Sequence, residues 1–194
     1  MAKFAGIAAV GRSLEALLSA SFEQEEPVPG AQTKVILVRA VDFDSSAAAS
    51  VIGSPALSIL LYRVDLNESM RAAWSAVSIQ AGRAPLPVDL HYLLTPWADT
   101  AEHEHLILAK TLECLWSTPM LSGPLLDPMG GWAPGESVEV VMEDIPTLTK
   151  LDSMLSGFRL SAACMARMVR IERHEQPDAH STPRAKGLKP GVKP

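Results

Sequence analysis

The stretch from residue 86 to residue 117 constrains the fold more than any other part of the chain. Apolar and polar residues alternate from Leu86 to Leu94, which is the period-two pattern of a β-strand with one buried face. Thr95-Pro96 is expected to end this strand, and residues 101–117 follow with helical spacing until Pro119 stops the helix. A strand followed so closely by a helix predicts a fold that combines both kinds of element around one core.

The helix at residues 101–117 has apolar residues around much of its circumference. Its main apolar stripe is expected to consist of Leu108, Leu112, Leu115 and Trp116. Leu106 and Ile107 lie off that stripe. The pattern therefore predicts burial on more than one side, and a contact between subunits would supply the second side.

The remaining segments complete an expected fold of class α/β (α+β). Residues 3–22 carry apolar residues at helical spacing and predict an N-terminal helix. Apolar runs or alternation predict four further strands, at residues 35–41, 57–67, 136–143 and 158–173. The continuously apolar run at 35–41 is typical of a strand covered on both faces and is expected to be central in the sheet. The result is a mixed sheet of about five strands packed with the N-terminal helix and the central helix. A short helix at 148–155, closed by Gly157, precedes the last strand.

Length and composition indicate one domain over residues 1–173. A chain of 194 residues of which 47% are hydrophobic is long enough to bury a sizeable core. From residue 174 onward the sequence is polar, contains four prolines and has no apolar pattern. Residues 174–194 are therefore expected to form a disordered tail.

Charge and hydropathy exclude several classes of partner. A net charge of −5 and a pI near 5.5 give no basic face for nucleic acid. No uninterrupted apolar run is long enough to cross a bilayer, so membrane insertion is not expected. The two cysteines, Cys114 and Cys164, lie far apart in apolar surroundings and are expected to be reduced core thiols in a cytoplasmic protein.

Two clusters of polar residues suggest chemistry, but neither has the spacing that the chemistry needs. Residues 102–105 read Glu-His-Glu-His, yet His103 and His105 would face nearly opposite directions on a helix, unlike the paired ligands of a zinc enzyme. Asp89 and His91 share one strand face and form a conceivable acid/base pair, but the sequence places no nucleophile beside them. Polar residues on a strand surface more often face solvent or an interface. No catalytic residue, cofactor or metal is assigned.

A glycine-containing loop at residues 129–136 lacks the Lys-Ser/Thr pair of a phosphate-binding loop. Its Trp132 is expected to be an exposed indole and a candidate anchor for a partner. The interface candidates are Trp132, Leu106, Ile107, His91 and Asp89.

Three ordered blocks resemble a known family. They read LSILLYRVDLNESMR from Leu57, LPVDLHYLLTPWADTAEHEHLILAKTLECLWSTPML from Leu86, and LTKLDSMLSGFRLSAACMARMVRI from Leu148. The most specific element is the run from Leu90 to Thr95, followed by Glu102 and the leucine-rich helix. Together the blocks resemble the family labelled DUF4255, the cap or tail-terminator proteins of extracellular contractile injection systems, over residues 4–173.

The resemblance implies a structural role. Such a protein forms a sixfold ring on the distal end of the inner tube, stops tube polymerisation and connects the tube to the contractile sheath. Its partners would be other copies of itself, the tube protein and the sheath protein, in a phage-tail-like particle assembled in the cytoplasm. Two alternatives stay open: a small hydrolase or metal-dependent enzyme that uses Asp89, His91 or residues 102–105, and an adaptor that binds a partner through Trp132 or an exposed strand edge.

Overall fold

The computed structural model describes residues 2–44, 51–70, 85–144 and 159–172. Within them six strands form one sheet: β1 (Lys34–Val38), β2 (Ala56–Leu66), β3 (Leu86–Trp97), β4 (Met120–Ser122), β5 (Ser137–Glu143) and β6 (Ala162–Ile171). The strand order is β1-β2-β3-β6-β5-β4, with β1 parallel to β2 and the other neighbours antiparallel. The expected mixed sheet is confirmed, and the additional strand is β4, which is too short to produce a pattern in the sequence. The helix expected at 148–155 and the tail expected at 174–194 lie outside the described residues.

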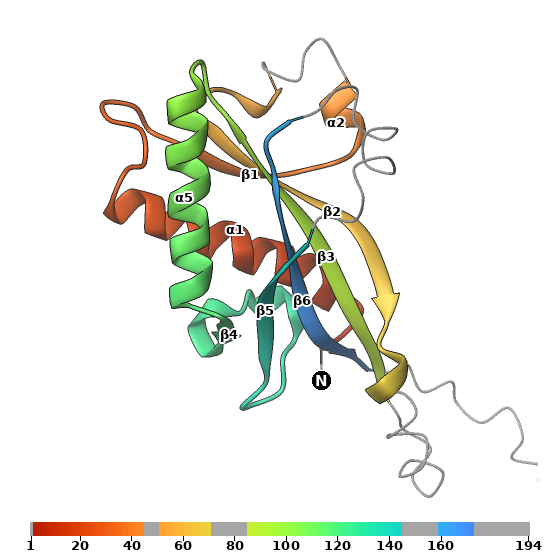
Figure 1. The fold of residues 1–194 in the computed structure, drawn as a ribbon. Coiled ribbons are helices and arrows are strands. Elements are labelled where there is room, and N and C mark those ends of the chain that lie inside the picture. Colours follow the sequence, from red (N-terminus) through yellow and green to blue (C-terminus); the bar gives the residue numbers. More distant parts are fainter. Residues whose placement is uncertain (1, 45–50, 71–84, 145–158, 173–194) are drawn as a thin grey trace, which may run out of the picture.

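Two long helices, α1 (Gly6–Gln24) and α5 (Ala101–Ser117), cover one face of the sheet and confirm the two expected helices. Figure 1 shows α5 running across α1 beside the sheet. The core between the helices and the sheet is formed by large buried side chains, among them Leu14, Leu18, Leu90, Tyr92 and Ile107. The apolar stripe of α1 therefore packs where its helical spacing predicted.

The other face of the sheet is covered at one end by a second, smaller apolar cluster. Phe43 of the short helix α2 (Val41–Asp44) packs there with Ile52, Leu60, Leu93 and Trp97. The buried Trp97 indole donates a hydrogen bond to Ser58 Oγ at 2.8 Å. Toward the other end this face carries the polar side chains of the candidate site.

The strand expected at 35–41 is shorter than predicted and lies at the edge of the sheet, so the prediction of a central strand was wrong. Val35 and Leu37 pack against the core under α1, while Ile36 and Val38 pack against the cluster of α2. Both faces of β1 are thus covered, which explains the continuous apolar run. Coverage of the two faces does not determine how many strands pair with β1, and among the described strands only β2 does so.

The strand beginning at Leu86 does not end at Thr95-Pro96 but continues to Trp97. Pro96 lies opposite Leu57 of β2. The Lys34 N–H donates to the Pro55 carbonyl at 3.2 Å, so the backbone of Pro55 points toward β1. Alternate residues of a strand direct their backbone groups to the same side, so the N–H and C=O of Leu57 also point toward β1 and not toward Pro96. On its other side the pairing with β6 has already ended at Leu94. The ladder therefore requires no N–H at position 96, and proline is tolerated there.

Helix α5 begins and ends where predicted, but it is rotated relative to the predicted stripe. Thr100 caps its N-terminus by accepting from the His103 N–H at 3.2 Å. The buried residues are Ile107, Thr111, Cys114 and Leu115. Thr111 is a core residue because its hydroxyl donates to the Ile107 carbonyl at 2.8 Å. The predicted stripe left out Thr111 because threonine is polar, and it therefore lay on the neighbouring residues. It included Trp116, which is 84% exposed.

Candidate functional site

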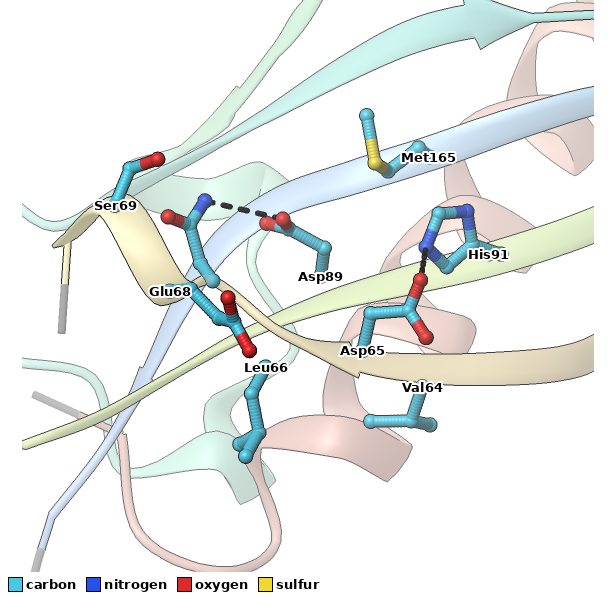
Figure 2. A pocket seen from close by; sticks show the side chains of 9 residues that line it. Val64, Asp65, Leu66, Glu68, Ser69, Asp89, His91 and Met165 are labelled. Atoms are coloured by element: carbon cyan, nitrogen blue, oxygen red, sulfur yellow. Dashed lines mark hydrogen bonds and ion pairs between the residues drawn. The ribbon is translucent and has the colours of Figure 1, made fainter.

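The polar side chains of β2, β3 and β5 meet on the sheet face opposite α1 and α5. His91 of β3 is only 3% exposed, and its Nδ1 lies 2.7 Å from Glu143 Oε2 of β5. Its Nε2 lies 3.2 Å from Asp65 Oδ2 of β2, the contact drawn in Figure 2. Arg63 completes the cluster, with its Nε 2.9 Å from the same Asp65 oxygen and its Nη2 3.2 Å from both nitrogens of the ring. The cluster of Arg63, Asp65, His91 and Glu143 thus ties three strands together.

Two carboxylates and one guanidinium surround the His91 imidazole. Each ring nitrogen faces one carboxylate oxygen, and Arg63 Nη2 lies near both nitrogens as well. A general base needs a ring nitrogen that is available to the reacting group. His91 therefore has the geometry of a buried cross-strand link.

Asp89 has a different set of partners, although it shares the strand face of His91. One of its oxygens accepts from the Met168 backbone N–H at 2.8 Å, and the other from Asn67 Nδ2 at 3.0 Å. Met168 occupies a bulge in β6, where the register against β3 shifts and φ is +57°. That left-handed conformation is costly for a residue with a side chain. Asp89 anchors the bulge by accepting its N–H.

An open groove of about 640 Å³ lies beside these residues, between the end of β2 and the centre of the sheet. Its lining includes Asp65, Glu68, Ser69, Asp89 and His91. Figure 2 shows Ser69 and His91 at opposite ends of the groove.

The histidines and glutamates at residues 102–105 lie at the start of helix α5. In the described part of the chain no group of three or more His, Cys, Asp or Glu side chains is arranged to hold a metal ion. Glu102 and Glu104 lie in the first turn of α5, where negative charge stabilises the helix.

The interface candidates on α5 have opposite environments. Leu106 is 40% exposed, whereas Ile107 is fully buried in the core of its own subunit. Ile107 is therefore not available at the surface as the interface hypothesis requires, because it belongs to the face of α5 that packs on the sheet. The sequence pattern did not predict that Trp116 is exposed. A threonine in a helix can be buried when its hydroxyl donates to the carbonyl four residues earlier, as Thr111 does to Ile107. Placing Thr111 on the buried side would have placed Trp116 at the surface.

Trp132 is not the exposed indole that its loop suggested. Its Nε1 donates to the Asp127 carbonyl at 2.7 Å, and its ring packs against the main core. Gly130 makes room for it, since a Cβ there would lie 2.4 Å from the indole. The Trp132 side chain thus links its loop to Asp127 and to the core. A role of Trp132 in an interface stays a prediction.

Both cysteines are free and buried, as expected. Burial raises the pKa of Cys164 to about 12, with a smaller contribution from the charge of Glu143. Burial also raises the pKa of Cys114. Both residues are consequently thiols at neutral pH, and thiols react much more slowly than thiolates. None of the described helices is long and apolar enough to span a membrane.

Comparison with known proteins identifies a shared fold and a family. The fold is similar to the cryo-EM structure of the PVC sheath/tube terminator of an extracellular contractile injection system in the extended state, with 17% sequence identity and a TM-score of 0.54 over 96% of this chain and 63% of that one. The chain belongs to the family described as the Pvc16 N-terminal domain, whose model matches residues 9–183. The cap of the anti-feeding prophage is also similar, with 16% identity and a TM-score of 0.48 over 96% of this chain and 60% of that chain.

The chain spans less than two thirds of the length of these two solved relatives. Among curated proteins no sequence matches it.

Proposed function

We propose that this protein is a terminator subunit of a contractile injection system, which ends the inner tube and links the tube to the sheath. The observation that carries the proposal is the family match over residues 9–183, supported by the fold shared with a sheath/tube terminator. The role is structural. The partners are other copies of the chain, the tube protein and the sheath protein, in a particle resembling a phage tail.

The surface of α5 supports this proposal. Its outward side carries Leu106, Leu112 and Trp116, which are 40%, 36% and 84% exposed. An exposed tryptophan flanked by leucines is typical of a protein interface. A ring subunit needs such a second apolar surface in addition to its own core. We assign this outward side of α5 to a contact with a neighbouring subunit.

The polar cluster argues against the enzyme alternative. His91 is enclosed by the carboxylates of Asp65 and Glu143, and both oxygens of Asp89 hold backbone or amide donors. Among the described residues, these contacts leave neither His91 nor Asp89 positioned as a base next to a nucleophile. The adaptor alternative differs from the terminator in its stoichiometry, because an adaptor pairs one to one with its partner.

Native mass spectrometry of the purified protein tests the ring. A ring of six copies is expected, with a mass six times the 20.8 kDa of the chain. Trp116→Ala should shift the population toward the monomer while the thermal unfolding midpoint stays close to that of the unaltered protein, because the side chain is mostly outside the core. Glu102→Ala, an exposed change elsewhere on α5, is the matched control. A monomer at every accessible concentration would contradict the ring.

A further inference from the structure

One long strand edge of the sheet is left open in the described structure. Strand β2 runs from Ala56 to Leu66, but β1 pairs only with its first part, from Ala56 to Leu60. Along Leu61–Leu66 no described strand lies on the outer side of β2. Figure 1 shows this half of β2 curving away from the helices at the margin of the molecule. We call Leu61–Leu66 the free edge.

The hydrogen-bonding groups of the free edge can be assigned from its pairing with β3. Asn67 donates to the Pro87 carbonyl at 3.1 Å, so the alternate residues Asp65 and Arg63 also direct their backbone groups toward β3. The backbone N–H and C=O groups of Val64 and Leu66 consequently point outward. A row of outward N–H and C=O groups is the template for adding another strand.

The outer edge of β1, in contrast, has its N–H groups occupied by side chains. Carboxylates accept from three outward N–H groups in and beside β1: Glu26 from Thr33 at 2.8 Å, Glu15 from Leu37 at 3.2 Å, and Asp42 from Arg39 at 2.7 Å. Occupied amides cannot pair with another chain, which protects the edge against unwanted strand addition. Within the described residues, no carboxylate caps an N–H group of the free edge in this way.

The side chains around the free edge favour one kind of occupant. On the core side of β2, Val64 and Leu66 are 46% and 48% exposed, and the neighbouring Leu86 of β3 is 45% exposed. On the other side lies the groove, whose lining carries the carboxylates of Asp65, Glu68 and Asp89. Arg63 offsets the charge of Asp65, and Glu68 and Asp89 keep the groove acidic, since the donors to Asp89 are neutral. Because side chains alternate across a strand, an added strand would present every second residue to each environment.

We propose that the free edge of β2 binds an extended segment of a partner protein in which apolar residues alternate with basic ones. The apolar residues cover Val64 and Leu66, and the basic residues face the acidic groove. The segment adds to the sheet beyond the end of β1 and pairs with the backbone of Val64 and Leu66. This inference does not rest on the terminator role.

Synthetic peptides test the binding directly. The probes are blocked peptides of about seven residues, the length of a typical strand, which alternate valine with lysine or, as a control for charge, valine with glutamate. The valine-lysine peptide is expected to bind and to protect the amides of Val64 and Leu66 from hydrogen exchange. The same peptide with N-methyl groups on alternate residues should lose binding in one of its two methylation registers, because that register removes the donors that pair with β2.

Two pairs of protein variants locate the site. Val64→Pro removes an outward N–H without touching the ladder to β3, and should weaken binding by about tenfold or more, whereas Val64→Thr keeps the N–H and should bind like the unaltered chain. Glu68→Lys should weaken binding of the valine-lysine peptide, and Glu102→Lys, with the same change in net charge on α5, should not.

Three results would overturn the proposal. One is that the valine-glutamate peptide binds as tightly as the valine-lysine peptide, which would mean that the acidic groove does not contribute to binding. Another is equal binding to Val64→Pro, or insensitivity to both methylation registers, which would remove backbone pairing at the free edge. The third is protection of the Val64 and Leu66 amides that rises with protein concentration in the absence of peptide, which would assign the edge to a second copy of this chain.

Discussion

Ile107→Ala is expected to lower the free energy of unfolding by about 2–5 kcal/mol, the usual cost of truncating a fully buried isoleucine. Ile107 is completely buried and packs between α5 and the sheet, so the substitution leaves a cavity that the surrounding strands cannot fill. Leu106→Ala, one residue along the same helix, should cost less than about 1 kcal/mol because Leu106 is 40% exposed. Urea denaturation of the two variants measures the difference.

The same two variants separate core from interface. Leu106→Ala should weaken subunit association at unchanged fold stability, whereas Ile107→Ala should change stability first. Equal losses of stability in the two variants would mean that α5 is rotated relative to the structure described here. An association defect confined to Ile107→Ala, in protein that is fully folded, would contradict the assignment of Leu106 to the outward side.

Asp89→Ala is expected to lower the free energy of unfolding by about 1–3 kcal/mol, because it leaves a backbone donor and an amide donor without their acceptor. The Met168 N–H lies in a left-handed bulge that Asp89 holds in place. Asp89→Asn should recover part of the loss, since its one carbonyl oxygen can still accept from Met168. The midpoint of urea denaturation measures both effects.

A change of the adjacent Asp65 provides the control for this prediction. Asp65 is 48% exposed and pairs with Arg63 and His91 rather than with the bulge. Asp65→Ala should therefore cost less than Asp89→Ala, because exposed ion pairs contribute little to stability. If Asp89→Ala were as stable as the unaltered chain, the anchoring role of Asp89 would be wrong.

Local patterns predicted the elements well where a single face is buried. The helix at 101–117 agrees with α5 at both ends, since Thr100 caps its start and Pro119 follows its end. The alternation at 158–173 predicts a strand despite its alanine and methionine content, and β6 confirms the strand over Ala162–Ile171. Periodicity was sufficient to predict the type of these elements, although it misplaced the buried stripe of α5.

Relations between elements were less accessible from the sequence. The apolar run of β1 reflects coverage by α1 and α2 and carries no signal for its place at the edge. Pro96 is tolerated inside β3 because of how Leu57 is paired, which depends on the register of two other strands. Strand order and register are set by tertiary packing rather than by local propensity.

The candidate site could be predicted only in part. Asp89 and His91 were recognised as neighbours on one strand face, but their partners Glu143 and Asp65 lie on other strands. No spacing rule connects these positions, because the bulges at Tyr62 and Met168 shift the register on both sides of β3. Trp132 was expected at the surface because its loop is rich in glycine, whereas the small Gly130 is what allows the indole to pack inward.

The length of the inner tube tests the terminator role most directly. Tube protein of the same particle would be polymerised in vitro with increasing amounts of this protein, and the lengths measured by electron microscopy. The account predicts that mean tube length falls as the ratio of terminator to tube protein rises, with the added protein located at one end of each tube. An unchanged length distribution at every ratio, with no protein at the tube ends, would contradict it.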